Sequence, residues 1–340
     1  MTALIADTAD TDDAVMRARD LTVEVSTEHG WVTIVDGVNL TVRRNEIVGL
    51  VGESGSGKTV TSLSVMGLLP RNARITRGSV EVMGRTISTL TERQLTEVRG
   101  VQAAMIFQEP RRCLNPAFTV GDQVAESLRR HRGWSRKRAL QRTVELFELV
   151  EIPQATRRVK QYPHEFSGGM CQRVMLAMAL ACDPMLLIAD EPTTALDVTV
   201  QRQVLELIRR LQAQLGIGVL LITHDLGVVA EMCDRVSVMY AGQVVEEADA
   251  DTLFHEPKHP YTSGLLQSML EPTQRGRPLG YISGLVPPPH QFPATCRFQE
   301  RCSYAVDSAC RTTVELHQVS PAHSSRCARI DDLKLPGVTD

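Results

Sequence analysis

A glycine-rich segment ending in a lysine and a threonine carries the clearest chemistry in the sequence. Residues 52–59 read GESGSGKT and fit the pattern G-x-x-x-x-G-K-[ST]. In this pattern the glycines let the backbone curl, so that its amide N–H groups point at phosphate oxygens. Lys58 is expected to reach the terminal phosphates, and the hydroxyl of Thr59 is expected to hold Mg²⁺. The predicted contacts to a phosphate-bearing ligand are Ser54, Gly55, Ser56, Gly57, Lys58, Thr59 and Val60.

Two carboxylates and a histidine follow apolar runs further along the chain. Asp190 and Glu191 come after the run Met185–Ala189, and His224 comes after the run Val219–Ile222. Asp190 suits Mg²⁺, and Glu191 suits activation of a water molecule for attack on a phosphate. Each signal is weak alone, because buried strands often end in Asp and lone histidines are commonly structural. Together with the glycine-rich segment they indicate one phosphate-transfer site.

These residues need strands that end at a common edge. The run Glu46–Val51 predicts a strand before the glycine-rich segment, and Thr59–Leu69 is compatible with a helix after it. The runs that precede Asp190 and His224 predict two further buried strands. In open α/β sheets, ligands bind at the carboxyl edge of parallel strands. The sequence therefore predicts an α/β core with the site at that edge.

Length and composition fit a soluble chain with a sizeable core. The 340 residues allow two domains or one large core with an appendage, and 43% of them are apolar. A net charge of −3 and only 7 Phe, 5 Tyr and 2 Trp argue against a nucleic-acid partner. The longest apolar run, Val174–Cys182, is far shorter than the ~20 residues that span a bilayer. With no secretory signal at the acidic start, we expect the chain to stay in the cytoplasm.

A further motif lies between these strands. Residues 166–173 read FSGGMCQR and resemble the signature motif of ATP-binding-cassette (ABC) ATPases. A Ser-Gly-Gly turn before a helix is itself a good anion-binding start. In that family the signature of one subunit caps the nucleotide held by the phosphate loop of the other. The resemblance implies that this role falls to Ser167, Gly168, Gly169 and Met170.

The other markers of the ABC family occur in the family's order. They are Gln108, the pair Asp190 and Glu191, the D-loop Ala195-Leu196-Asp197, and His224. The resemblance implies an ATPase whose Mg²⁺ is positioned by Thr59, Gln108 and Asp190. It further implies that Glu191 polarises the attacking water and that His224 stabilises the γ-phosphate.

The resemblance narrows to the ATPase subunits of dipeptide, oligopeptide and nickel importers. GLVGESGSGK over residues 49–58, FQEP over 107–110, LNP over 114–116 and HPYT over 259–262 are similar to that branch. A signature of the form FSGGM resembles the D-type subunit, which implies a heterodimer with an F-type paralogue. It also implies two integral membrane permease subunits, an extracytoplasmic solute-binding protein and a peripheral location on the cytoplasmic face of the cell membrane. Which solute is carried stays open.

The resemblance also implies the architecture. We expect a P-loop ABC-type nucleotide-binding domain, with a RecA-like core and a helical subdomain, followed by a small C-terminal Cys-rich extension. The expected boundaries are a disordered acidic tail over residues 1–17, the ABC ATPase domain over 18–255, its helical subdomain over about 91–174, and the extension over 256–340. The segment Glu109–Pro116 is expected to meet a coupling helix of the permease.

Two positions depart from the branch. Cys171 stands where these subunits commonly have Arg, and no obvious aromatic residue precedes the phosphate loop to stack on adenine. His29 lies nearest to that position and is our candidate, with Trp31 as a rival. A plain surface turn residue is an equal alternative for His29.

Four cysteines crowd the end of the chain. Cys296, Cys302, Cys310 and Cys327 have the spacing C-x5-C-x7-C-x16-C, which matches neither paired zinc knuckles nor the ferredoxin pattern. Four thiolates can hold Zn²⁺ or an iron–sulfur cluster, and spacing does not choose between them. The stretch PATCRFQERC over residues 293–302 resembles the peptide-importer ATPases, which implies a [4Fe–4S] cluster. Zinc and four unliganded thiols remain alternatives, and His317 or His323 could replace a thiolate.

Two other classes of protein share part of this pattern. A non-transport ABC ATPase, acting on nucleic acid or ribosomes or as a redox sensor, usually has two cassettes or a long coiled coil, whereas this chain has one phosphate loop. A P-loop small-molecule kinase has no use for FSGGM or for His224.

Overall fold

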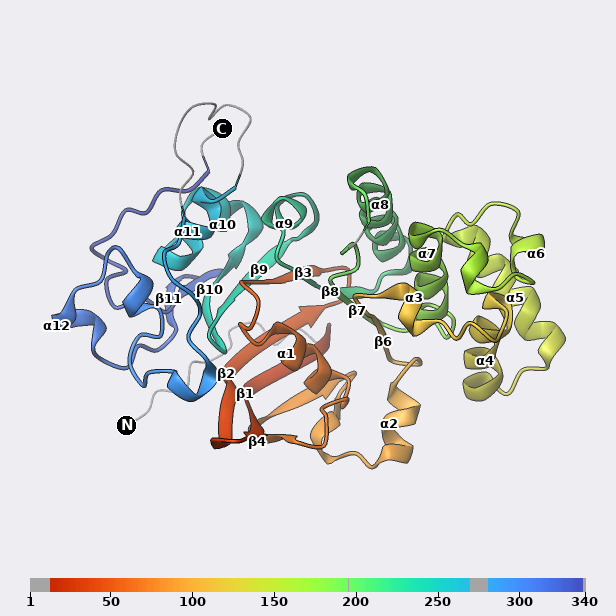
Figure 1. The fold of residues 1–340 in the computed structure, drawn as a ribbon, viewed down its shortest axis with the longest axis horizontal. Helices are drawn as coiled ribbons and strands as arrows, with labels where there is room; N and C mark the ends of the chain where they lie inside the picture. Colours follow the sequence, from red (N-terminus) through yellow and green to blue (C-terminus); the bar gives the residue numbers. More distant parts are fainter. Residues whose placement is uncertain (1–12, 195, 270–280, 339–340) are drawn as a thin grey trace.

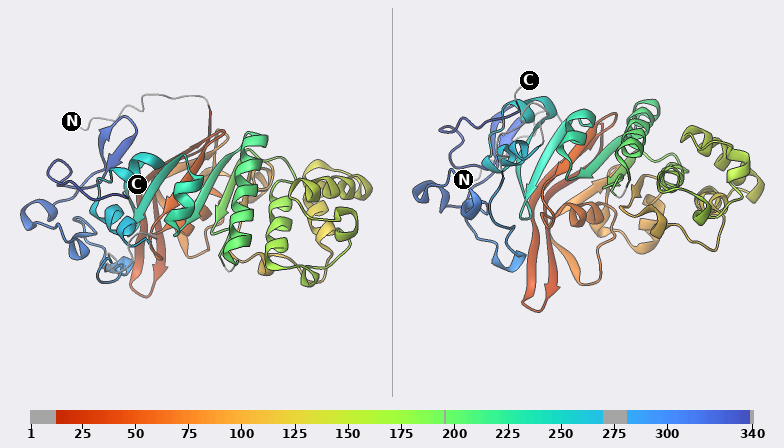
Figure 2. Two further views of the ribbon diagram at one scale, coloured as in Figure 1. Left: turned by 90° about the horizontal axis from the view of Figure 1, so that it is seen from above. Right: turned by 45° about the horizontal axis from the view of Figure 1, so that its top comes forward.

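The computed structural model describes residues 13–194, 196–269 and 281–338. Most of the predicted acidic tail, and Ala195 of the D-loop, lie outside these residues. The molecule is elongated, with the helices of residues 110–179 at one end and the cysteine-rich segment at the other (Figures 1 and 2). Two sheets lie between these ends. None of the helices within the described ranges is long and apolar enough to cross a membrane.

An eight-stranded sheet forms the centre of the described chain. Its strand order is β11-β12-β10-β9-β3-β8-β7-β6, and β6, β7, β8, β3 and β9 run parallel. The bounds are β3 (Ile47–Val51), β6 (Ala103–Ile106), β7 (Leu186–Asp190), β8 (Gly218–Thr223), β9 (Arg235–Tyr240), β10 (Gln243–Asp249), β11 (His317–Ser320) and β12 (His323–Ser325). The three strands predicted from apolar runs are β3, β7 and β8. Every residue of these three strands is buried, which explains why they read as unbroken apolar runs.

A four-stranded antiparallel sheet packs against one face of the central sheet. Its order is β2-β1-β4-β5, with β1 (Ala14–Thr27), β2 (Gly30–Arg43), β4 (Ala73–Val82) and β5 (Arg85–Thr86). Strand β1 begins before the boundary expected at residue 18, so the predicted tail is too long. The reason is pairing and burial: Met16 pairs with Val42 and Val82, and its side chain lies in the core.

Alternate residues of the central strands point into two separate cores. Val48 and Leu50 of β3 join the core beneath the antiparallel sheet. Ile47 and Val51 join the opposite core, which also takes in the helices at the far end of the molecule. This period of two is the ordinary geometry of a strand buried on both faces. The central sheet therefore fixes the position of both layers.

Helices cover the faces and ends of the central sheet. Around the core lie α1 (Lys58–Val65), α2 (Glu92–Val98), α8 (Val198–Leu215), α9 (Leu226–Met232), α10 (Ala250–His255) and α11 (Pro260–Gln267), whereas α12 (Asp307–Cys310) lies in the cysteine-rich segment (Figure 1). At one end lie α3 (Pro110–Cys113), α4 (Val120–Arg132), α5 (Arg136–Leu149), α6 (Ala155–Arg158) and α7 (Gly168–Ala179). The interval 91–174, expected to be a helical insert, also contains β6, because residues 103–106 pair with β7 of the central sheet.

The cysteine-rich segment is built onto the central sheet. Strand β12 pairs antiparallel with β10, so residues 317–325 extend the sheet at the edge opposite to β6. A buried polar contact supports this junction: His323 Nε2 lies 2.8 Å from Glu246 Oε1 of β10. Glu246 also accepts hydrogen bonds from the backbone N–H groups of Lys258 and His259. The extension is therefore joined to the core by strand pairing and by this buried carboxylate.

Candidate functional site

The glycine-rich loop connects the carboxyl end of β3 to the first turn of α1. Gly57 precedes α1 with a φ of 106°, a conformation that side chains disfavour. Gly52 has a φ of 148°, and a Cβ atom there would lie 2.1 Å from the carbonyl oxygen of Met239 on β9. Only glycine permits that approach. Of the predicted contacts, Ser54, Gly55 and Thr59 are exposed, Gly57 and Val60 are half-buried, and Ser56 and Lys58 are buried.

Lys58 lies inside this loop and carries its charge close to three carboxylates. Its ammonium group donates to the carbonyl oxygens of Gly52 at 2.7 Å and Glu53 at 2.9 Å. Burial lowers the pKa of Lys58, although the charges of Glu191, Asp190 and Glu53 act in the opposite direction. A cation held inside the glycine-rich loop matches what phosphate oxygens require.

Asp190 lies at the end of β7, beside the start of α1. Its carboxylate has the hydroxyl of Thr59 as a hydrogen-bond partner, whereas Ser62 Oγ donates to the carbonyl oxygen of Thr59 at 2.8 Å. Burial and the adjacent charge of Glu191 nevertheless raise the pKa of Asp190. A carboxylate and a hydroxyl in contact are oxygen ligands of the kind that Mg²⁺ takes. The donor set of Thr59 and Asp190 therefore fits this ion.

Glu191 is the point where three other polar side chains meet. Its Oε2 accepts from Gln108 Nε2 at 2.7 Å and from the hydroxyl of Thr194 at 2.9 Å, and its Oε1 lies 3.1 Å from Nδ1 of His224. Burial opposes ionisation, but the hydrogen bonds from Thr194 and His224 and the charges of His224 and Lys58 outweigh it and lower the pKa of Glu191. Glu191 is held as a carboxylate.

The backbone at Glu191 is unusual. Its φ is 47°, in the left-handed region that a residue other than glycine rarely adopts. Its N–H donates to the carbonyl oxygen of Ile222 at the end of β8, which holds the turn in place. This conformation directs the side chain away from β7 toward the residues that follow β6 and β8. Gln108 comes from the first of these ends and His224 from the second, so the structure brings both predicted residues to Glu191.

The predicted signature begins α7, at a distance from the phosphate loop of its own chain. Ser167 caps α7, and its hydroxyl accepts from the N–H of Met170. In Figure 1, α7 lies with the helices at the end of the molecule, beyond β7 as seen from α1. Throughout the described residues, no hydrogen bond or ion pair joins the signature to the phosphate loop. Within one chain the two motifs are therefore separate.

The signature instead contacts the start of α8. Asp197 caps α8 by accepting from the N–H of Val200 at 3.0 Å. Val200 lies against Gly169, where a Cβ atom would come within 2.4 Å of Val200 Cγ1. Leu196 lies against Gly168 at the looser distance of 3.4 Å. The predicted D-loop and signature residues thus form one packed surface.

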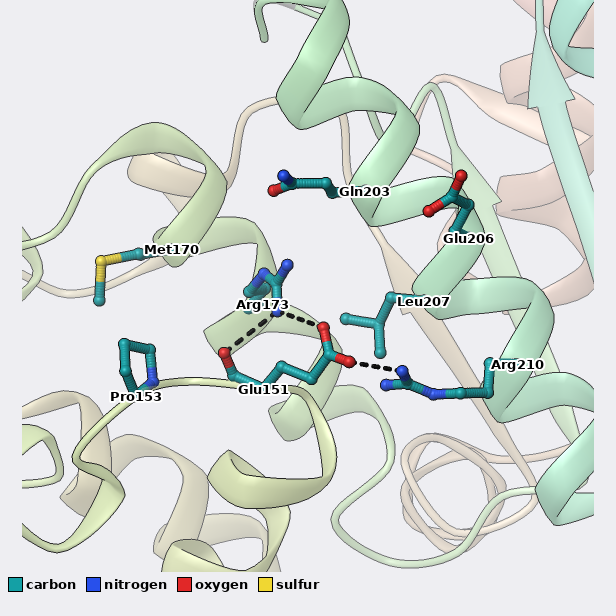
Figure 3. Close-up of a pocket in the computed structure, with 8 residues that line it drawn as sticks. All are labelled: Glu151, Pro153, Met170, Arg173, Gln203, Glu206, Leu207 and Arg210. Atoms are coloured by element: carbon teal, nitrogen blue, oxygen red, sulfur yellow. Dashed lines mark hydrogen bonds and ion pairs between the residues drawn. The ribbon is translucent and has the colours of Figure 1, made fainter.

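An open pocket of about 660 Å³ lies between α7, α8 and the segment of residues 151–153 (Figure 3). Met170 and Arg173 of α7 line it, together with Glu151 and residues of α8. Glu151 links the helical end to the core, because its carboxylate pairs with both Arg173 and Arg210. Hydrogen bonds from Arg210 and Arg173 lower the pKa of Glu151. The pocket is lateral to the phosphate loop and contains none of its residues.

The two candidates for adenine stacking have other neighbours. The ring of His29 lies 4.3 Å from the ring of His290, in the segment that precedes the cysteines. The face of Trp31 is covered by the guanidinium of Arg74, 3.9 Å from the ring centroid. Cys171, the other departure, is fully buried with its Sγ 3.7 Å from the carbonyl oxygen of Pro163. It replaces the expected arginine with a packed side chain.

All four cysteines of the extension line one small cavity of about 20 Å³. Burial raises the pKa of Cys302 to about 11, and the charges of Cys296, Cys327 and Cys310 act in the same direction. Within the described ranges, no three Cys, His, Asp or Glu side chains lie close enough together to hold a single metal ion. The proposed substitutes do not join the thiols, since His317 is exposed and the side chain of His323 contacts Glu246.

Two groups that the sequence did not single out for the site contact it. Thr194 donates to Glu191, and only its place three residues later could have suggested this. Glu53, within the glycine-rich loop, pairs with Arg301 of the extension at 2.6 Å. No local pattern connects residues so far apart in the sequence.

Comparison with known proteins identifies the family. A family model described as "ABC transporter" matches residues 35–194, and one described as "Oligopeptide/dipeptide transporter, C-terminal region" matches residues 245–310. A putative peptide import ATP-binding protein of Brucella ovis is 48% identical over 314 residues, covering 89% of this chain and 93% of the relative. This chain belongs to the ABC transporter family of ATP-binding proteins.

Other relatives and solved structures agree with the ABC assignment. A probable peptide ABC transporter ATP-binding protein of Sinorhizobium fredii is 47% identical over 325 residues, covering 94% of this chain and 96% of the relative. The ATP-binding cassette MJ0796, solved as a dimer bound to ADP and Pi, superposes with a TM-score of 0.62 at 27% identity. That match covers 69% of this chain and 98% of MJ0796. The predicted ABC-type α/β fold is confirmed, and the chain is an ATPase of this family.

Proposed function

We propose that this ABC ATPase hydrolyses ATP to power the import of peptides through a separate membrane permease. The observation that carries the proposal is the arrangement around Glu191, where Gln108 and His224 meet a carboxylate beside Asp190 and the phosphate loop. The match of residues 245–310 to the C-terminal region of oligopeptide and dipeptide transporters supports the substrate class. So do the names of its relatives in Brucella and Sinorhizobium.

In this proposal each residue of the site has a role in ATP hydrolysis. Lys58 and the loop amides neutralise phosphate charge, and Thr59, Gln108 and Asp190 hold Mg²⁺ and its waters. When bound, Mg²⁺ would neutralise charge on the phosphate oxygens. Glu191 accepts a proton from the attacking water, and His224 stabilises the γ-phosphate. His29 is the proposed adenine contact, through the ring face that does not lie against His290.

We also propose that the chain acts as one half of a heterodimer. The separation of its signature from its own phosphate loop supports a partner that supplies the missing half of each site. In this arrangement Ser167, Gly168 and Gly169, with Met170, contact ATP held by an F-type paralogue. Two permease subunits, with an extracytoplasmic solute-binding protein, complete the importer. The ATPase then lies at the cytoplasmic face of the membrane, with Glu109–Pro116 against the permease.

For the extension we propose a [4Fe–4S] cluster held by Cys296, Cys302, Cys310 and Cys327. The donor set fits, because four thiols line one cavity. A zinc ion with four Zn–S bonds of about 2.3 Å needs sulfurs about 3.8 Å apart. Within the described residues no three ligating side chains are grouped to hold a metal ion, so the preference for a cluster over zinc rests on the resemblance of residues 293–302 to the peptide-importer ATPases. Because the cavity is only about 20 Å³, the thiols must move outward to admit it.

Peptide uptake in cells tests the function. Deletion of the gene is expected to abolish uptake of labelled dipeptides and oligopeptides, and the wild-type chain should restore it. Lys58→Ala should not restore uptake, whereas Lys160→Ala, at an exposed lysine outside the site, should. Normal peptide uptake in the deletion strain would contradict the substrate class. Co-purification with ribosomes or DNA in place of integral permeases would contradict the importer role.

Metal analysis tests the cluster. Protein purified anaerobically is expected to be brown and to contain about four iron atoms and four acid-labile sulfides per chain. Replacing Cys302 with Ser should reduce both, whereas replacing the exposed Cys113 should not. A colourless protein with stoichiometric zinc would overturn the cluster, and a metal-free protein would leave four unliganded thiols.

A further inference from the structure

Residues of the C-terminal extension hold Glu53 of the phosphate loop in place. The guanidinium of Arg301 donates to both carboxylate oxygens of Glu53, at 2.6 and 3.0 Å. The N–H of Glu53 donates to the hydroxyl of Tyr261 on α11 at 2.9 Å. Both the side chain and the backbone of one loop residue are thus held by residues beyond position 256. A bidentate arginine–carboxylate pair also fixes geometry, because its two hydrogen bonds must be parallel.

Arg301 is itself held in place by the extension. Its side chain is only 6% exposed. Its Nε donates to the carbonyl oxygen of Ser283 at 2.9 Å, and its guanidinium lies 5.6 Å from the ring of Tyr240. The adjacent residue is Cys302, one of the four thiols of the cavity. The arginine therefore connects the phosphate loop directly to the thiol cluster.

An aromatic cluster makes the connection rigid. Phe298, between Cys296 and Arg301, packs edge-on against Tyr240 at 5.2 Å and Tyr261 at 5.3 Å. Phe298, Tyr240 and Tyr261 are all buried. The segment from residue 296 to 302 thus presents a packed ring, a buried arginine and two thiols within seven positions. We therefore expect that a change that disorders the thiols also loosens Arg301.

The charge of Glu53 matters at the phosphate site. The carbonyl oxygen of Glu53 accepts from the ammonium of Lys58, and its carboxylate belongs to the same loop. A carboxylate without a partner here would repel the phosphates of ATP. The paired guanidinium of Arg301 neutralises that carboxylate and fixes its position. Arg301 is thus placed to affect ATP binding without touching the nucleotide.

We propose that Arg301 is a positioning residue for the phosphate loop. Through Arg301, an ordered cysteine-rich extension raises the affinity for ATP, and bound ATP orders the extension. This inference rests on the proposed ATP site. Because coupling between two sites is reciprocal, ATP bound to the loop must order residues 296–302 as much as their order favours ATP.

The test is a double-mutant cycle read by the equilibrium dissociation constant for ATP, measured on the full-length chain. Arg301→Ala is expected to weaken ATP binding about tenfold, the magnitude of a lost charge-assisted hydrogen bond. Adding Glu53→Gln should recover most of that loss, because the carboxylate that Arg301 neutralises is then absent. A purely structural role gives no such recovery. Unchanged affinity in Arg301→Ala, or additive losses in the double variant, would overturn the proposal.

Arg297→Ala is the matched control. Arg297 lies in the same segment, is similarly buried, and pairs with Asp36 of β2 instead of with the loop. It should lower thermal stability as Arg301→Ala does, while ATP affinity stays within about twofold of wild type. A tenfold loss in this control would show that damage to the extension alone weakens ATP binding, and that Arg301 has no specific role.

A second measurement covers the case in which Arg301→Ala does not fold. In the wild-type chain, saturating ATP is expected to slow amide hydrogen exchange over residues 296–302. Lys58→Ala, which should lose ATP binding, should show no slowing. Unchanged exchange in a wild-type chain that binds ATP would refute the coupling alone. Normal ATP binding by Lys58→Ala would instead refute the proposed ATP site.

Discussion

Replacing Glu191 with Gln separates binding from hydrolysis, because the structure can accommodate the amide. Oε2 of Glu191 accepts from Gln108 at 2.7 Å and Thr194 at 2.9 Å, so an amide oxygen at this position keeps both contacts. An amide nitrogen at the Oε1 position can donate to Nδ1 of His224, 3.1 Å away, when that nitrogen carries no proton. The contacts with Gln108 and Thr194 survive unchanged, the contact with His224 survives with Nδ1 unprotonated, and the negative charge is lost.

The expected cost of Glu191→Gln therefore lies in the chemical step. An amide does not accept the proton of an attacking water. Removal of one preorganised catalytic contact typically lowers kcat by about 10²–10³, or about 2.7–4 kcal/mol. ATP affinity should change by less than about threefold, since Lys58 and the loop amides are untouched. Loss of the charge next to Asp190, where Glu191 raises the pKa, further favours ionised Asp190.

The assay is phosphate release by the assembled transporter, with ATP binding measured in parallel. Glu97→Gln is the control, because Glu97 lies on α2 and pairs with Arg85 at the surface. It should have wild-type kcat and ATP affinity. Wild-type phosphate release by Glu191→Gln would refute the assignment of Glu191 as the residue that activates water. A tenfold or larger loss of ATP affinity in Glu191→Gln would refute the expectation that the preserved contacts keep the ATP site intact.

Three further outcomes follow from contacts in other parts of the molecule. Gly169→Ala should destabilise the fold by about 1–3 kcal/mol, because its Cβ would lie 2.4 Å from Val200, whereas Gly168→Ala meets only a 3.4 Å contact; thermal melting compares them. Glu151→Gln should lower the free energy of unfolding by less than about 1 kcal/mol at pH 7, since Glu151 and its partner Arg210 are half exposed. Because its arginine partners lower the pKa of Glu151 below its ordinary 4.5, this difference should vanish as pH falls through the lowered value, as urea unfolding at each pH can show. Burial raises the pKa of Cys233 to about 12, so mass spectrometry should find it unlabelled by iodoacetamide at pH 8 in the folded chain.

Local sequence sufficed for the strands and loops that bear the site. The runs before the phosphate loop, before Asp190 and before His224 are apolar because β3, β7 and β8 are buried on both faces. Parallel strands deliver their following residues to a common edge. For that reason the convergence of His224 on the Asp190-Glu191 end of β7 could be anticipated from the apolar runs, whereas Gln108 was expected there only from the resemblance to ABC ATPases.

Boundaries were harder to predict, because they depend on distant partners. Residues 14–17 look like part of an acidic tail, yet they pair with β2 and β4 across the chain. Residues 103–106 lie inside what reads as a helical insert, yet they form the edge strand β6. The composition of a segment indicates how polar it is, whereas strand pairing depends on which other segment lies beside it.

The sequence by itself determined the chemistry of this protein: a phosphate loop at Lys58, the carboxylates Asp190 and Glu191, the signature and the four thiols. These patterns are local, because each motif works through the backbone geometry of its own few residues. Only the tertiary structure decided how the extension meets the site. Glu53 and Arg301 are 248 positions apart, and their contact exists because β12 pairs with β10 and brings the cysteine-rich segment against the phosphate loop. Such a contact depends on the order of strands across the sheet, which no local pattern specifies.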